Sequence, residues 1–136
     1  MIYDTKIALV LHQDLLPWQV ANVSAFLAGG LAASHGQLKG EPYRDASRRA
    51  YSPLIREPVF VFGATLDELR RTHLRALSRE LVPAVYIEEM FKTTNDVDNR
   101  AAFAIAPADA LNLVGLGVHG RRKTIDKVVN GLKFLA

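Results

Sequence analysis

A histidine and an aspartate follow the first apolar segment of the chain. The segment Lys6–Leu11 is apolar after its first residue, and the polar turn His12–Asp14 comes directly after it. Imidazole is the side chain that exchanges protons near neutral pH, so His12 could act as an acid or a base. Ligands of open α/β sheets bind at the carboxyl ends of strands. His12 and Asp14 are therefore candidate site residues, and the alternative is a turn histidine satisfied by the backbone.

A second polar cluster lies far along the chain, where residues 95–100 read Asn-Asp-Val-Asp-Asn-Arg. Asp96 and Asp98 could hold a divalent cation through oxygen ligands. A solvated loop explains them more simply, so we predict no metal site and no cofactor. Asp98, Asn99 and Arg100 remain candidates for another role in a site.

Three glycines near the end of the chain match the spacing G-x-G-x-x-G of a dinucleotide fingerprint, at Gly115, Gly117 and Gly120. The context does not fit, because no second parallel strand and no ribose-binding carboxylate follow. We expect these glycines to serve a strand end and a turn. Arg121 and Arg122 come directly afterwards, at the expected start of a helix, and form a candidate anion site.

A long connection between elements spans residues 37–58 and is rich in arginine, proline and tyrosine. Its arginines could contact phosphates, and Tyr43 and Tyr51 could stack on bases. Acidic residues offset this charge, so a solvated connection with a helical turn or two at Arg44–Tyr51 is the interpretation we favour. Nucleic acid is thus only weakly supported as a partner.

Composition limits the class of protein. The chain has 136 residues, 49% hydrophobic and 23% charged, with no cysteine and a net charge of +3. These values predict one domain over residues 1–136, with no disulfide and no thiolate chemistry. No secretory signal and no membrane span is recognisable, so we expect a cytoplasmic protein without a membrane partner.

Hydrophobic patterns predict the elements that position these residues. Unbroken apolar runs indicate buried strands at Lys6–Leu11, Val59–Phe62, Ala84–Ile87 and Leu111–Gly117. We expect helices over residues 18–33, from the capping box Thr65–Glu68 to about Leu81, and from Thr124 onward. Residues 88–107 are expected to form a second long connection. The order predicts an α/β domain of three layers, α/β/α, with a four-stranded mixed sheet and Lys6–Leu11 internal to it.

Two ends of the chain resemble the type II peptidyl-tRNA hydrolases. Residues 6–15, Lys-Ile-Ala-Leu-Val-Leu-His-Gln-Asp-Leu, are similar to that family's opening strand and turn, and Asp126–Leu135 is similar to its closing helix. The chain resembles even more closely a prokaryotic set known as domain of unknown function two thousand, which is taken to share that fold. The resemblance implies the hydrolase fold over essentially the whole chain. It also implies a homodimer, because proteins of that fold often pair.

The resemblance does not carry the catalytic residues with it. The hydrolase lysine would stand at Trp18 or Gln19, and the hydrolase aspartate near Asp98 or Asn99. We therefore predict a small-ligand-binding protein or divergent enzyme without that lysine, which takes a small or phosphate-bearing molecule. The alternatives are a divergent hydrolase acting on peptidyl-tRNA or a related ester, and a non-catalytic dimeric interaction domain. The predicted site comprises His12, Asp14, Asp98, Asn99 and Arg100 as reacting groups and Trp18, Gln19, Arg121 and Arg122 as binding groups.

Overall fold

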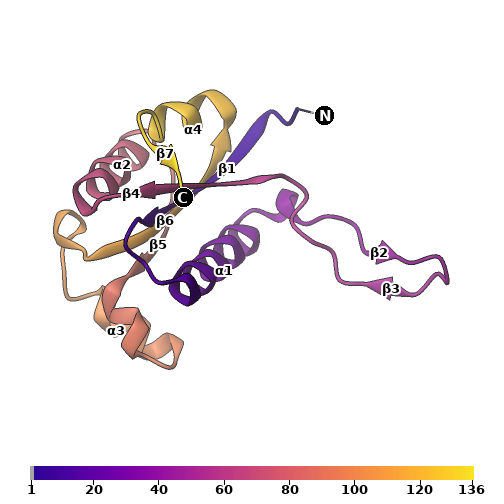
Figure 1. Cartoon of the computed structure of the whole chain (residues 1–136), viewed down its shortest axis with the longest axis horizontal. Coiled ribbons are helices and arrows are strands. Elements are labelled where there is room, and N and C mark those ends of the chain that lie inside the picture. Colours follow the sequence, from indigo (N-terminus) through magenta and orange to yellow (C-terminus); the bar gives the residue numbers. More distant parts are fainter. Residues whose placement is uncertain (1) are drawn as a thin grey trace.

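The computed structural model describes residues 2–136 and contains a five-stranded mixed sheet with helices on both faces (Figure 1). The sheet strands are β1 (Thr5–His12), β4 (Val59–Ala64), β5 (Ala84–Ile87), β6 (Leu113–Arg121) and β7 (Lys133–Phe134). The α-helices are α1 (Pro17–Ser34), α2 (Leu66–Ser78), α3 (Asp96–Phe103) and α4 (Arg122–Val128). A separate hairpin consists of β2 (Tyr43–Arg44) and β3 (Ala50–Tyr51), and short 3-10 turns are η1 (Gly36–Leu38), η2 (Glu88–Lys92) and η3 (Ala108–Ala110).

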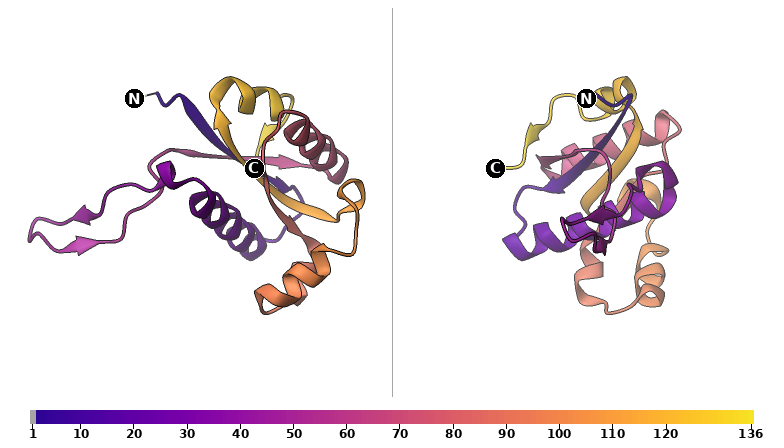
Figure 2. Two further views of the ribbon diagram at one scale, coloured as in Figure 1. Left: turned by 180° about the vertical axis from the view of Figure 1, so that it is seen from behind. Right: turned by 90° about the vertical axis from the view of Figure 1, so that its right-hand side faces the viewer.

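The apolar run that predicted a central strand is the middle of the sheet. The strand order is β5-β6-β1-β4-β7, with β1 parallel to β4 and antiparallel to β6. Both faces of β1 are covered, because Ile7, Leu9 and Leu11 pack against α1 while Ala8 and Val10 pack among residues of α2 and α4. The three layers are visible when the molecule is turned (Figure 2). The predicted position of this strand is confirmed.

The prediction of four strands was wrong, because the end of the chain adds a fifth. The helical spacing of Ile125 to Leu132 continues past the true end of α4 at Val128. Gly131 has a φ of +90°, which turns the chain out of the helix. Phe134 then pairs with Phe62 of β4 as the short edge strand β7.

Both long connections contain more structure than the sequence indicated. In the second, Asn95 accepts a hydrogen bond from the Asp98 backbone N–H at 2.8 Å and so caps α3, which was not predicted. In the first, the expected helical turn at Arg44–Tyr51 is instead the β2–β3 hairpin. Asp45 closes its turn by accepting from the backbone N–H groups of Ser47 and Arg49, at 2.9 and 3.0 Å. We call residues 39–56 the arm, because they project away from the sheet and helices (Figure 1).

None of the helices within residues 2–136 is long and apolar enough to cross a membrane.

Two glycines of β6 allow α1 to lie directly on the sheet. A Cβ at Gly115 would stand 2.5 Å from Val23 Cγ1, and one at Gly117 would stand 3.2 Å from Leu31 Cδ1. Both glycines lie inside β6. The prediction that they form a strand end and a turn was therefore wrong about their position in the strand. Gly115 and Gly117 admit the side chains of α1, whereas the third glycine of the spacing, Gly120, faces Leu81 and Ile125.

The contact at Gly115 predicts a specific loss of stability. Gly115→Ala should lower the free energy of unfolding by roughly 1–3 kcal/mol, because the new methyl group overlaps Val23. Gly29→Ala is the matched control, since Gly29 lies in α1 with no atom within 4 Å of an added Cβ. That variant should gain about 0.5–1 kcal/mol from helix propensity. Urea unfolding measures both, and equal effects of the two substitutions would contradict this account of the packing.

Candidate ligand-binding site

A small polar pocket of about 280 Å³ lies at the carboxyl end of β1. Its charged or polar lining residues are His12, Asp14, Gln19, Glu88 and Asn112. The Asp14 backbone N–H donates to His12 Nδ1 at 3.1 Å, so Nδ1 serves as an acceptor. This bond leaves Nε2 as the ring nitrogen that can donate. The pocket lining contains two carboxylates and no lysine or arginine.

Gln19 and Trp18 have separate structural roles at the start of α1. Gln19 Oε1 accepts from the Leu16 backbone N–H at 2.8 Å and satisfies one free donor of the helix start. Trp18 is 57% exposed, and its ring meets the edge of Phe91 with centroids 5.7 Å apart. Phe91 lines both the polar pocket and the cavity that contains Trp18, so the two hollows adjoin.

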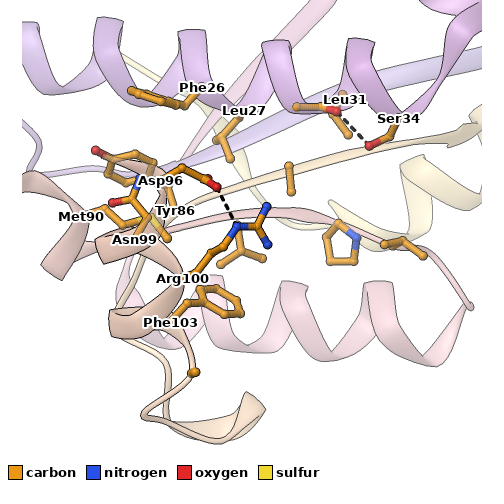
Figure 3. Close-up of a pocket in the computed structure, with 16 residues that line it drawn as sticks. Phe26, Leu27, Leu31, Ser34, Tyr86, Met90, Asp96, Asn99, Arg100 and Phe103 are labelled. Carbon is orange, nitrogen blue, oxygen red and sulfur yellow. Dashed lines mark hydrogen bonds and ion pairs between the residues drawn. The ribbon is translucent and has the colours of Figure 1, made fainter. Parts of the chain in front are cut away.

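A longer groove runs along α1 beside this pocket. It consists of two adjoining cavities of about 450 and 570 Å³, which share Phe26, Tyr86, Met90, Asp96 and Asn99. We call these two cavities together the groove. One wall is α1, the opposite wall is α3, and residues of β5 lie between them (Figure 3). Trp18 stands in the first cavity and Arg100 in the second.

The lining is mostly apolar in the larger cavity and about half polar in the smaller one. Asn99 accepts from the Thr93 hydroxyl through Oδ1, which leaves its amide N–H groups for a ligand. Burial raises the pKa of the Tyr86 phenol, so this hydroxyl is neutral and can donate. Arg100 Nε donates to Asp96 Oδ2 at 2.7 Å, and this hydrogen bond together with the charge of Asp96 raises the pKa of Arg100. The guanidinium extends from α3 toward the space below α1 (Figure 3).

The predicted site residues fall into four groups. His12, Asp14 and Gln19 line the polar pocket, and Trp18, Asn99 and Arg100 line the groove beside it. Asp98 lines neither, because its carboxylate accepts from the Asn95 side chain at 2.9 Å in the cap of α3. Arg121 and Arg122 lie at the other end of the sheet, where Arg121 pairs with Thr5 at the start of β1 and Arg122 Nε donates to the Tyr3 carbonyl.

The aromatic lining of the groove was not predicted. Phe26, Tyr86, Phe91 and Phe103 were not among the predicted site residues, yet Phe26 is 57% exposed. The signal was present in α1, which is apolar nearly all round although only Val23, Leu27 and Leu31 are buried. A helix of that kind needs cover on more than one face. No cluster of three acidic or histidine side chains in residues 2–136 is arranged to hold a metal ion.

Comparison with known proteins identifies the family. Residues 5–136 match the family described as "Protein of unknown function (DUF2000)". The chain belongs to this family. A solved structure of Atu0240, a protein of unknown function from Agrobacterium tumefaciens strain C58, resembles this DUF2000 chain with a TM-score of 0.95 at 41% identity. The match covers 99% of this chain and 100% of that one. A search of curated proteins found no match.

The arm takes part in that structural match. If its 18 residues matched nothing, 118 of 136 residues would remain and the score could not exceed about 0.87. The observed 0.95 therefore requires the arm of this DUF2000 chain and the corresponding segment of the Agrobacterium protein to take similar positions.

Proposed function

We propose that this chain binds a small amphipathic anion in the groove, as a ligand-binding protein or as an enzyme whose reacting groups line the polar pocket. The supporting observation is the lining: aromatic and aliphatic side chains dominate the larger cavity, which also holds one guanidinium, and aromatic and polar side chains are mixed in the smaller one. Ligand sites typically have 300–1,000 Å³, an apolar lining and a few placed polar groups.

The chemistry of the ligand follows from this lining. An apolar or aromatic body fits beside Phe26, Tyr86 and Met90, where contact removes apolar surface from water. Arg100 uses Nε for Asp96, so its two Nη groups remain as the donors that grip a carboxylate, sulfonate or phosphate oxygen pair. Asp96 holds the guanidinium in one orientation for that contact.

The type II peptidyl-tRNA hydrolase scaffold and its homodimer are part of the proposal. Support for the dimer comes from β5, which is an edge strand, and from Val82, which is 86% exposed just before it. We expect light scattering at micromolar concentration to give the mass of two chains. A monomer at every concentration would contradict the dimer and leave the ligand proposal standing.

Cleavage of peptidyl-tRNA is not expected, in spite of the scaffold. Ester hydrolysis places negative charge on an acyl oxygen, and losing one stabilising donor typically costs ~100- to 1,000-fold in rate. The polar pocket holds Asp14 and Glu88 but no cation, Gln19 is occupied as a cap, and Arg100 lines the groove instead. A single-turnover assay with labelled peptidyl-tRNA should show no release above background. Release that Asp98→Ala or Arg100→Ala abolishes would show a divergent hydrolase.

The groove can be tested through Trp18, the single tryptophan of the chain. Anilinonaphthalene sulfonate has an aromatic body and an anionic group, and its emission should be excited by energy transfer from Trp18 when it binds there. Arg100→Gln should weaken this binding by about three- to fivefold, the size of one exposed charged contact. The neutral analogue phenylnaphthylamine should bind the two proteins alike, since it makes no contact with the guanidinium.

Matched substitutions separate the groove from general surface effects. Phe26→Ser should weaken the binding of both probes. Leu74 is 54% exposed on α2, and Leu74→Ser should weaken the binding of neither. Arg71→Gln on α2 is the corresponding control for charge. The ligand proposal fails if Trp18 transfers no energy to either probe, or if the α2 variants reduce binding as much as the groove variants do.

A further inference from the structure

The arm is an ordered element that has few contacts with the protein core. Residues 41–52 are all exposed. The strand pairs of the arm are Tyr43 with Tyr51 and Arg44 with Ala50, together with a single bridge between Lys39 and Ile55 at its base. The arm extends from the end of α1 and η1 into open space and returns to β4 (Figure 2). A two-stranded hairpin of this size is marginal by itself in water, so its order needs a local cause.

The turn of the arm supplies part of that order through Asp45. Its Oδ1 accepts from two backbone N–H groups of the turn, and its Oδ2 accepts from the Tyr51 hydroxyl at 2.8 Å. These hydrogen bonds lower the pKa of Asp45, and the bond from Tyr51 has the largest effect. The carboxylate therefore stays ionised and keeps its hydrogen-bond partners in the turn. Arg48 takes a φ of +67° at the turn, which commits the tip to one shape.

The two chain segments at the base of the arm are hydrogen-bonded to each other, and one residue beyond the arm is bonded to β1. Gly40 N–H donates to the Leu54 carbonyl at 3.1 Å, and Arg56 N–H donates to the Leu38 carbonyl at 2.9 Å. Just beyond the arm, the buried Glu57 accepts from the Thr5 hydroxyl at 2.7 Å. The direction of the arm is therefore set by the body, in agreement with the similar segment of the Agrobacterium protein.

The net charge of the protein is located on the arm. Residues 39–56 contain five basic and two acidic side chains, which accounts for the whole net charge of +3. The other residues contain 12 basic and 12 acidic side chains and are neutral as a set. The basic residues of the arm are Lys39, Arg44, Arg48, Arg49 and Arg56.

Two tyrosines share one face of the arm beside this charge. Tyr43 and Tyr51 are direct cross-strand partners, so their side chains stand on the same face of the hairpin. They are 55% and 50% exposed, although aromatic rings are normally covered. The hydroxyl of Tyr51 is held by Asp45, which orients its ring while half of it remains open to a partner.

We propose that the arm binds single-stranded nucleic acid, with Arg44, Arg48 and Arg49 on phosphates and the Tyr43–Tyr51 pair stacked on unpaired bases. Cations that follow a backbone and aromatic rings that accept any base are the two components of sequence-tolerant single-strand binding. A second copy of this chain fits less well, because two arms of equal charge repel and the neutral body offers no opposite net charge to attract one.

Fluorescence anisotropy with labelled mixed-sequence RNA and DNA strands tests the proposal. Arg44→Gln, Arg48→Gln and Arg49→Gln combined should weaken binding by at least about tenfold at low salt, and the logarithmic salt slope of the wild type should be near −2 for about three phosphate contacts. Tyr43→Ser should weaken binding about fivefold or more through lost stacking. Stronger binding to RNA than to DNA, or the reverse, would identify the natural strand.

The control removes the same charge from the body. Arg71→Gln, Arg79→Gln and Lys123→Gln combined alters three exposed cations and should leave binding within about twofold. Both triple variants should melt like the wild type, since none of these residues is in the core. Three outcomes would overturn the proposal: no binding by the wild type at low salt, equal loss in both triple variants, or an arm variant that dissociates a dimer without changing nucleic-acid binding. The groove proposal is unaffected by any of them.

Discussion

The close approach of α1 to the sheet is the constraint on which the rest of the structure depends. It exists because β6 has no side chain at Gly115 and Gly117, so Val23, Leu27 and Leu31 can reach the central strands. The position of α1 in turn sets both hollows of the candidate site. Its first turn carries Gln19 beside the polar pocket, and its exposed side carries Trp18 and Phe26 along the groove. A helix held farther from the sheet would leave neither hollow with its present walls.

The order of the layers could be predicted from the sequence because it depends on patterns that span many residues. An unbroken apolar run such as Lys6–Leu11 is buried on both faces whatever covers it, and the Thr65–Glu68 box marks a helix start by its own chemistry. The errors concern short elements. The fifth strand, α3 and the arm hairpin depend on single residues, Gly131, Asn95 and Asp45, whose effect is visible only when the neighbouring backbone is in place.

The candidate site was predictable in part for the same reason. His12 and Asp14 follow a strand whose direction and central place were clear, so their position at its carboxyl end followed. The apolar lining was not predictable, because a phenylalanine in a groove and one in a core look alike in a sequence. Asp98 and Asn99 are adjacent residues with similar side chains, yet α3 turns Asn99 into the groove and uses Asp98 for its cap.

Charge and shape divide this molecule into two parts with different chemistry. The body is neutral in sum and contains a groove whose larger cavity is mostly apolar with one guanidinium. Such a lining favours binding through buried apolar surface more than through long-range charge attraction. The arm has little contact area of its own and carries the whole net charge, a combination that favours a long polyanion. The buried Glu57 follows the arm directly and ties its end to the sheet. Its carboxylate accepts from the Thr5 hydroxyl of β1, and Oε2 lies 3.6 Å from His119 Nε2 of β6. Ser34, the last residue of α1, lines the groove, and the arm begins five residues later, so a partner held by the arm would lie near that end of the groove.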